Sequence, residues 1–243
     1  MNRYAIQVDE TISTLVTDGD YEKLTKGYII EARNEILDYI EGHPEFETSF
    51  YPVYVTKSAG PIIKRMSEAS LKIDVGPMAS VAGAIAQYVV EELVNTGVRH
   101  VIFDNGGDIA MHLQEPAVIG IYRGPIGAQN LGFRISTMNK LLGICTSSGT
   151  VGHSFSFGVS DAAIVQSQDV TLADAVATAL GNRISAEEPG TIASALNETM
   201  IEGIDGLMVI IGNLVGSTGN LPDIVKAKVD YSLISKGGRD ENC

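Results

Sequence analysis

The middle of this chain is dominated by strand-like segments, and its helical segments lie between sets of strands instead of alternating with them. Strict alternation of strands and helices would predict a doubly wound parallel sheet. The observed order predicts an α+β fold of mixed, largely antiparallel sheets layered with helices. With 243 residues, of which 44% are hydrophobic, the chain can bury a sizeable core. We therefore expect a single domain over residues 1–243, with a frayed tail over about 232–243.

The N-terminal part predicts a hairpin followed by a long helix. Residues 3–8 and 11–17 have the composition of two strands joined by a turn. From Leu24 to Ile40 apolar residues recur at intervals of three and four, which predicts an amphipathic helix that ends before Pro44. The other expected elements are a strand at 50–55, helices at 60–71 and 76–97, strands within 99–113, 117–125, 131–136, 141–146 and 161–168, helices at 171–184 and 189–200, and a last buried strand at 206–212.

Charge and hydropathy argue against two classes of partner. The net charge of −13 gives no basic footprint for nucleic acid and disfavours an anionic membrane surface. The apolar stretch 75–94 carries Gln87, Glu91 and Glu92, which favours a buried helix over a membrane span. We therefore expect neither a nucleic acid nor a membrane as partner.

Cysteine usage and the N-terminus favour a cytoplasmic protein. The two cysteines, Cys145 and Cys243, do not form a disulfide framework. The first ten residues lack the apolar core of a secretory signal. Several short strands have edges that need cover, so we also expect a homo-oligomer.

Neither of the common phosphate-binding loops occurs, so candidate sites come from other glycine-rich and small-residue segments. The helix that begins at Gly76 is rich in Gly and Ala in its first half, which suits close packing or the approach of a ligand. In "DNGGDI" (104–109), the glycines fit a tight hairpin turn. The same stretch places Asp104, Asn105 and Asp108 together at the end of a sheet, where they could bind a ligand.

Asp174 and Thr178 lie four residues apart in "TLADAVATAL", so they share one face of a helix. Two oxygen ligands on one face suit Mg²⁺, which keeps several waters or substrate phosphates. The alternative is a capping box, in which Thr171 is the N-cap and Asp174 caps its own helix. Local sequence leaves both interpretations open.

The loop "CTSSGTVGHSFSFG" (145–158) combines hydroxyl side chains, glycines and one histidine. His153 is a candidate general acid or base, or a phosphate ligand. Cys145 is a candidate nucleophile, but it ends the apolar run "LLGIC", and buried cysteines are usually inert.

Taken in order, these segments resemble the ApbE-like superfamily, whose characterised members are FAD:protein FMN transferases. "ADAVATAL" is similar to the family segment A-D-A-x-A-T-A-x, "NGGDI" to its G-G-[DE]-[IV] turn, and "TSSG" to its T-S-G-[DS] loop. His153 falls where the family's H-I-x-D-P-x-T-G histidine stands. The resemblance covers roughly residues 70–185.

The resemblance implies a function and a site. The family transfers FMN from FAD to a protein Ser or Thr hydroxyl and uses Mg²⁺ at the pyrophosphate. By resemblance, Asp174 and Thr178 would hold Mg²⁺, and His153 would be catalytic. The cofactor-binding residues would be those of the two glycine turns, where backbone donors would face phosphates: Asn105, Gly106, Gly107, Asp108, Thr146, Ser147, Ser148 and Gly149.

Two departures from the family keep other functions open. The small-residue helix has no lysine before its turn, and "HSFSFG" replaces the family's D-P-x-T-G after the histidine. One alternative is a protein that binds FAD or another nucleotide without transferring it. A second is an enzyme unrelated to flavin that uses His153 with Ser148, Thr150 or Cys145.

Overall fold

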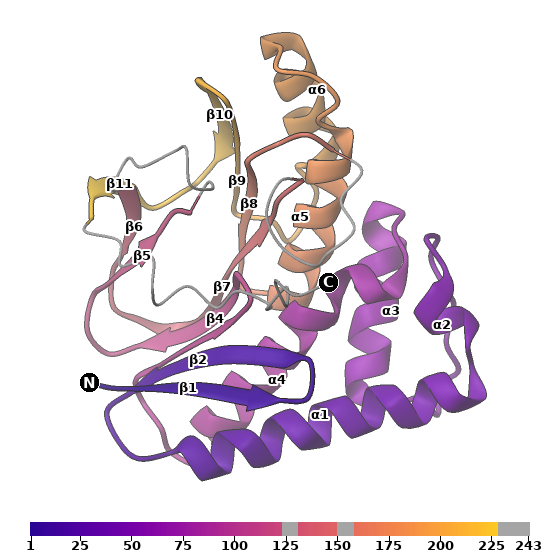
Figure 1. The fold of residues 1–243 in the computed structure, drawn as a ribbon, viewed down its shortest axis with the longest axis vertical. Coiled ribbons are helices and arrows are strands. Elements are labelled where there is room, and N and C mark those ends of the chain that lie inside the picture. Colours follow the sequence, from indigo (N-terminus) through magenta and orange to yellow (C-terminus); the bar gives the residue numbers. More distant parts are fainter. Residues whose placement is uncertain (123–130, 150–157, 228–243) are drawn as a thin grey trace, which may run out of the picture.

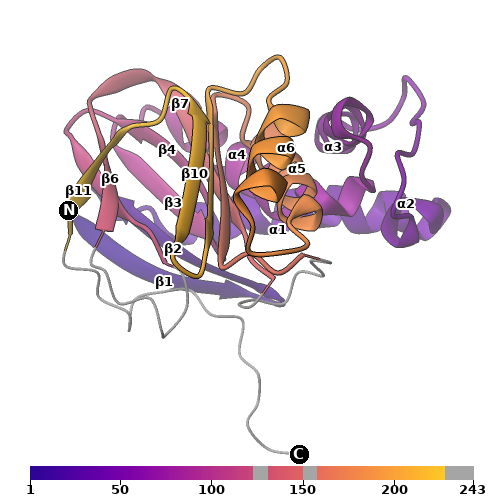
Figure 2. The same ribbon diagram turned by 90° about the horizontal axis from the view of Figure 1, so that it is seen from above.

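The computed structural model describes residues 1–122, 131–149 and 158–227. Its centre is an eight-stranded sheet in the order β1-β2-β3-β4-β7-β8-β9-β10, in which every neighbouring pair is antiparallel. Helices cover one face of this sheet, and a three-stranded sheet, β11-β6-β5, lies on its other side (Figures 1 and 2). The predicted α+β class with largely antiparallel sheets is confirmed.

The structure has the following elements. The strands are β1 (Asn2–Val8), β2 (Thr11–Thr17), β3 (Val101–Asn105), β4 (Asp108–Leu113), β5 (Ala117–Gly120), β6 (Leu131–Ile135), β7 (Met138–Ser147), β8 (Ala162–Ser167), β9 (Gly206–Ile211), β10 (Leu214–Gly219) and β11 (Asp223–Lys226). The helices are α1 (Glu22–Gly42), α2 (Glu45–Thr48), α3 (Pro61–Ile73), the 3₁₀ helix η1 (Pro77–Ser80), α4 (Val81–Asn95), α5 (Val170–Arg183) and α6 (Pro189–Thr199).

The central strands of the large sheet are buried on both faces, which explains their continuous apolar runs. In β8, Ala163 and Val165 pack into the helix-side core, whereas Ile164 packs into the second core between the sheets. β9 alternates in the same way, with Leu207 on the helix side and Met208 on the other. Side chains two residues apart share a face, so one strand contributes to both cores.

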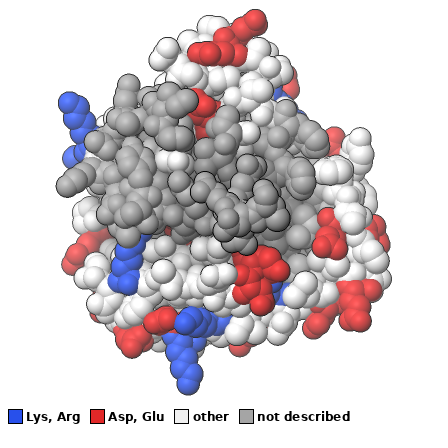
Figure 3. Space-filling view, in the orientation of Figure 1, with Lys and Arg blue, Asp and Glu red and all other residues white. Residues whose placement is uncertain are grey.

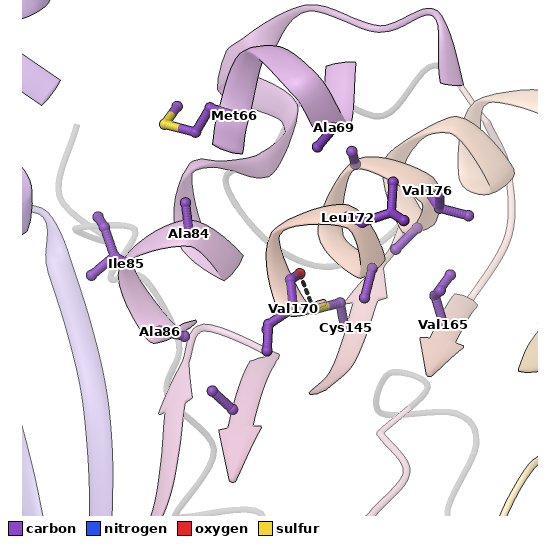
Figure 4. Close-up of a cluster of buried hydrophobic side chains, with 14 of the residues drawn as sticks. Met66, Ala69, Ala84, Ile85, Ala86, Cys145, Val165, Val170, Leu172 and Val176 are labelled. Carbon is purple, nitrogen blue, oxygen red and sulfur yellow. Dashed lines mark hydrogen bonds between the residues drawn. The ribbon is translucent and has the colours of Figure 1, made fainter. Parts of the chain in front are cut away.

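Helices α4 and α5 lie against the centre of the sheet and form the middle of the helix layer. Both are rich in small buried residues, such as Ala84 and Ala86 in α4, which let the helices approach each other and the sheet closely (Figure 4). Figure 4 also shows Cys145 of β7 under α5, among Val165, Val170 and Leu172.

Three segments differ from the prediction. Residues 50–55 are not a strand, because the carbonyl of Val53 accepts a hydrogen bond from the Ser67 hydroxyl of α3 at 2.6 Å instead of pairing with a strand. The helix predicted at 76–97 begins as η1 and becomes α-helical only at Val81. β9 is the last buried strand, as predicted, but two more exposed strands that were not predicted, β10 and β11, follow it. The tail predicted at 232–243 lies outside the described residues.

Within the described ranges, no single helix is long and apolar enough to cross a membrane; α3 and η1–α4 meet that criterion only as a pair bent by 104°. On the face in Figure 3, Asp and Glu side chains gather at several places on the described surface, in keeping with the net charge of −13.

Candidate functional site

The β3–β4 hairpin has the tight turn that "NGGD" predicts. Gly106 and Gly107 have φ values of 70° and 108°, which glycine adopts without strain. The Asp104 carboxylate accepts a hydrogen bond from the Gly107 amide at 2.9 Å and so closes the turn. Asn105 and Asp108 are paired in the hairpin register. The sequence therefore correctly locates the turn, and the structure assigns Asp104 a role within it.

Strand alternation separates the three polar residues of this turn. Asn105 and Asp108 face the helix layer, as do Phe103 and Ala110. Asp104 points to the opposite side of the sheet. The Asn105 side-chain amide donates to the carbonyl of Ala82 at 3.0 Å, which fixes the hairpin to the first turn of α4.

Helix α5 is aligned antiparallel to η1 and α4 by three polar contacts at regular intervals. The Thr178 hydroxyl donates to the Ala79 carbonyl at 3.3 Å. One turn further along, the Gly83 amide donates to Asp174 Oδ2 at 2.8 Å. At the far end, the Thr171 amide and hydroxyl donate to Gln87 Oε1 at 3.0 and 2.9 Å. These contacts set the position of α5, which carries both predicted metal ligands.

The capping-box interpretation of Asp174 is wrong. The N-cap of α5 is Asp169, whose side chain accepts a hydrogen bond from the Leu172 amide at 3.0 Å. Thr171 is already inside the helix and bonds to Gln87. Asp174 therefore caps no turn of its own helix, and its carboxylate instead faces the N-terminal amides of α4.

The environment of Asp174 is apolar enough to disfavour its charged form. Burial raises the pKa of Asp174 to about 7, and hydrogen bonds from the backbone of Gly83 and Ala82 offset only part of that shift. A carboxyl group with this pKa exchanges its proton near neutral pH. It is therefore poised to release a proton when a cation binds.

Asp108 and Cys145 lie next to this carboxylate. The β4–β7 register places Ile109 opposite Ile144, so Asp108 stands across from Cys145. Burial, and then the charge of Asp174, raise the pKa of Asp108 well above its usual value. Burial and the two carboxylates also raise the pKa of the Cys145 thiol, whose sulfur lies 3.5 Å from the Val170 carbonyl (Figure 4). Cys145 is thus a buried thiol of the core, which argues against its use as a nucleophile.

The "TSSG" segment ends β7 beside the hairpin turn. Thr146 and Ser147 are its last strand residues, and the Thr146 carbonyl lies 3.8 Å from the position a Cβ on Gly107 would take. The two predicted glycine turns are therefore brought together. Ser148 and Gly149 follow directly after the strand. His153 and Thr150 lie outside the described residues.

Two backbone donors expected to face phosphates are used inside the protein. The Gly149 amide donates to the Ser160 carbonyl at 3.0 Å, and the Gly107 amide to Asp104. A Cβ on Gly149 would stand 2.1 Å from the Gly158 carbonyl oxygen. This glycine therefore lets two segments of the backbone pack closely. Any phosphate contact of these turns must use other groups.

The oxygen atoms gathered here fit a hard divalent cation. Asp174, Thr178 and Asp108 offer carboxylate and hydroxyl oxygens, which Mg²⁺ prefers over nitrogen or sulfur. Within residues 1–122, 131–149 and 158–227, no group of three or more His, Cys, Asp or Glu side chains is arranged so that it alone could hold a metal ion. A site with few protein ligands is the usual arrangement for Mg²⁺, which completes its shell with water and substrate phosphates.

Gln87 and Gly83 are site-supporting residues that were not singled out from the sequence. They are four residues apart, so they lie on one face of α4 and meet α5 together. The stripe of small residues in α4 indicates close packing of that face, but it does not identify the partner helix. The contact with α5 joins residues more than 80 positions apart, beyond the reach of local patterns.

We expect Gln87→Leu to lower the free energy of unfolding by about 2–3 kcal/mol, because it leaves the buried Thr171 amide and hydroxyl without an acceptor. Urea denaturation followed by circular dichroism measures this loss. Gln114→Leu makes the same change at an exposed position and should alter stability by no more than about 0.5 kcal/mol. Equal effects of the two substitutions would contradict the role given to Gln87.

Comparison with known proteins supports the expected family. The family model described as AbpE bacteria matches residues 3–202. A UPF0280 protein of Methanocella arvoryzae is 43% identical over 232 residues, which cover 95% of this chain and 94% of the relative. A UPF0280 protein of Archaeoglobus fulgidus is 41% identical over 241 residues, which cover 98% of this chain and 100% of the relative.

Solved structures share the fold at low sequence identity. The flavin transferase ApbE from Vibrio cholerae superposes with a TM-score of 0.56 at 13% identity, covering 91% of this chain and 96% of that chain. The ApbE protein from Thermotoga maritima gives a TM-score of 0.54 at 12% identity, covering 97% and 100%. The resemblance to ApbE-like proteins predicted from the motifs is confirmed.

Proposed function

This chain belongs to the AbpE bacteria family and is related over its length to UPF0280 proteins, and from that premise we propose that it is a magnesium-dependent phosphotransferase acting on FAD or a related dinucleotide. In the finer form of the proposal, it transfers FMN from FAD to a Ser or Thr hydroxyl of a protein acceptor. The name of the Vibrio cholerae structural neighbour, a flavin transferase, supports this choice of chemistry.

The observation that carries the proposal is the pairing of α4 with α5. The Gly83 amide holds Oδ2 of Asp174 at 2.8 Å, and Thr178 follows on the same face of α5. Asp174 and Thr178 would hold Mg²⁺. When bound beside a pyrophosphate, Mg²⁺ neutralises the charge that develops on the leaving phosphate.

The chain's own groups would position the reactants. The hydrogen bond from Asn105 to Ala82 keeps the β3–β4 turn beside the first turn of α4, where a dinucleotide phosphate would approach the cation. Ser147 lies on the helix side of β7, like Cys145, and its hydroxyl and that of Ser148 would bind the same ligand, whereas the Thr146 side chain points to the opposite face of the sheet. His153, by resemblance, would accept the proton of the attacking hydroxyl.

Release of AMP from FAD tests this function. The purified protein is incubated with FAD, Mg²⁺ and a Ser- or Thr-containing acceptor protein, and AMP is quantified by chromatography. We expect Asp174→Asn to lower the rate by about 100-fold or more, since it removes a ligand of the cation. Asp104→Asn removes one acidic group on the opposite face of the sheet and should retain the rate. Absence of AMP with every acceptor, in the presence of Mg²⁺, would rule out the transferase.

A second function is favoured by the sequence after His153. "HSFSFG" contains no carboxylate, and the small-residue helix has no lysine, so the chain departs from the transferases near their reacting groups. A protein that binds FAD without cleaving it would show saturable quenching of flavin fluorescence and no AMP. No binding of FAD or any other dinucleotide would argue against both functions.

A further inference from the structure

Asp108 has a buried carboxylate oxygen whose partner is missing among the described residues. The residue is 9% exposed, and its Oδ1 has no hydrogen-bond partner, although the carboxylate interacts with the Cys145 side chain and the Thr146 backbone. Leaving a buried acceptor unpaired costs roughly 1–3 kcal/mol, and more when the group is charged. Native proteins rarely keep such a group unless an ordered water or an ion satisfies it.

The carboxylate of Asp108 is directed toward the site on α5. Ala110, two residues along β4, packs into the helix-side core, so the Asp108 side chain lies on that face of the sheet too. Cys145 stands across from Asp108 on β7, and the Cys145 sulfur contacts the Val170 carbonyl, one helical turn before Asp174. Among ionisable side chains, Asp174 has the largest electrostatic effect on Asp108.

Among the described residues, no positive side chain forms an ion pair with either carboxylate. The ion pairs among the described residues all involve other acids: Asp9, Glu10, Glu22, Glu91 and Glu198. Buried carboxylates of like charge repel each other unless a cation or a proton lies between them. The Thr178 hydroxyl adds a further oxygen on the Asp174 side of the pair.

We infer that Asp108 is a second carboxylate ligand of the divalent cation that Asp174 and Thr178 would hold, in contact with it directly or through a bound water. This inference rests on the proposed function, because that function is what requires the cation. It assigns to the hairpin residue Asp108 a different task from that of its neighbour Asp104, which closes the turn. The β3–β4 turn would then be part of the cation site as well as of the dinucleotide site.

Binding of Mn²⁺ to the full chain without flavin tests this assignment. The dissociation constant is measured by electron paramagnetic resonance of free Mn²⁺, with Mg²⁺ as competitor, for the wild type, Asp108→Asn, Asp104→Asn and Asp174→Asn. We expect Asp108→Asn to weaken binding by about 10- to 100-fold or more. Asp104→Asn makes the same change of charge in the same turn and keeps an acceptor for the Gly107 amide. Because Asp104 lies on the opposite face of the sheet and its charge acts on Asp108 less than that of Asp174 does, this variant should weaken binding much less than Asp108→Asn.

The outcomes distinguish a failure of the inference alone from a failure of the proposed function. If Asp174→Asn abolishes Mn²⁺ binding while Asp108→Asn binds like the wild type, Asp108 is only a buried structural acid and the inference is overturned. If the wild type binds no Mn²⁺ at millimolar concentrations, the magnesium-dependent function fails along with the inference. Should Asp108→Asn not fold, Asp108→Ala serves in its place. A thermal melt of that variant with and without Mn²⁺ then measures the loss of binding.

Discussion

Replacing Gly83 by alanine is expected to lower the free energy of unfolding by about 2–3 kcal/mol, a large effect for the addition of one methyl group. A Cβ at this position would stand 2.6 Å from the Cβ of Asp174 and 2.7 Å from the Val170 carbonyl oxygen. Both contacts are too close for carbon, and the second involves backbone, so α5 must move away from α4. The shift would also lengthen the hydrogen bond between the Gly83 amide and Asp174.

A matched substitution in another helix separates this clash from the ordinary effect of alanine. Gly27 lies inside α1, and a Cβ there would meet no atom within 4 Å. Gly27→Ala should therefore stabilise the protein by about 0.5–1 kcal/mol, since alanine is the better helix former. Urea denaturation of both variants gives the comparison. A gain in stability for Gly83→Ala would show that α4 and α5 are not packed as closely as described.

The sequence predicts most helices and strands well because these elements have strong local patterns. The recurrence of apolar residues from Leu24 to Ile40 and the glycines of "DNGGDI" identify α1 and the β3–β4 turn correctly. By contrast, β10 alternates between exposed and half-buried positions and contains Gly216, so it lacks an apolar run. Its only local signal is the Gly212-Asn213 pair, which fits a two-residue hairpin turn after β9.

The site is less predictable than the fold because its contacts join distant parts of the chain. The spacing of Asp174 and Thr178 correctly places them on one helix, but it cannot show that Gly83 supplies the amide facing Asp174. The capping-box pattern is misleading for the same reason: Asp169 takes the N-cap, and Thr171 finds its partner on α4. Local sequence gives residue types, whereas the packing of α4 on α5 decides which of them act together.

Removing the charge of Asp174 is expected to stabilise the cation-free protein at alkaline pH. Burial raises the pKa of Asp174 to about 7, so between its ordinary pKa near 4 and this value the folded state binds a proton that the unfolded state does not. The free energy of unfolding of the wild type should therefore fall as the pH rises from 5 to 8. Asp174→Asn keeps an oxygen acceptor for the Gly83 amide but has no proton to lose. At pH 8 it should be more stable than the wild type by up to about 4 kcal/mol.

Added Mg²⁺ should narrow the difference in stability between the two proteins. A cation that binds the folded state stabilises it in proportion to the logarithm of its concentration, and it competes with the proton on Asp174. Mg²⁺ should thus raise the melting temperature of the wild type more at pH 8 than at pH 6, and that of Asp174→Asn hardly at all. Thermal melts across this pH range, with EDTA or with Mg²⁺, measure both effects.

A variant that is destabilised in EDTA at pH 8, or that responds to Mg²⁺ like the wild type, would mean that Asp174 is a structural acid. If both expectations hold, the chain keeps at position 174 a carboxylate that destabilises the cation-free fold, as expected for a residue retained for binding.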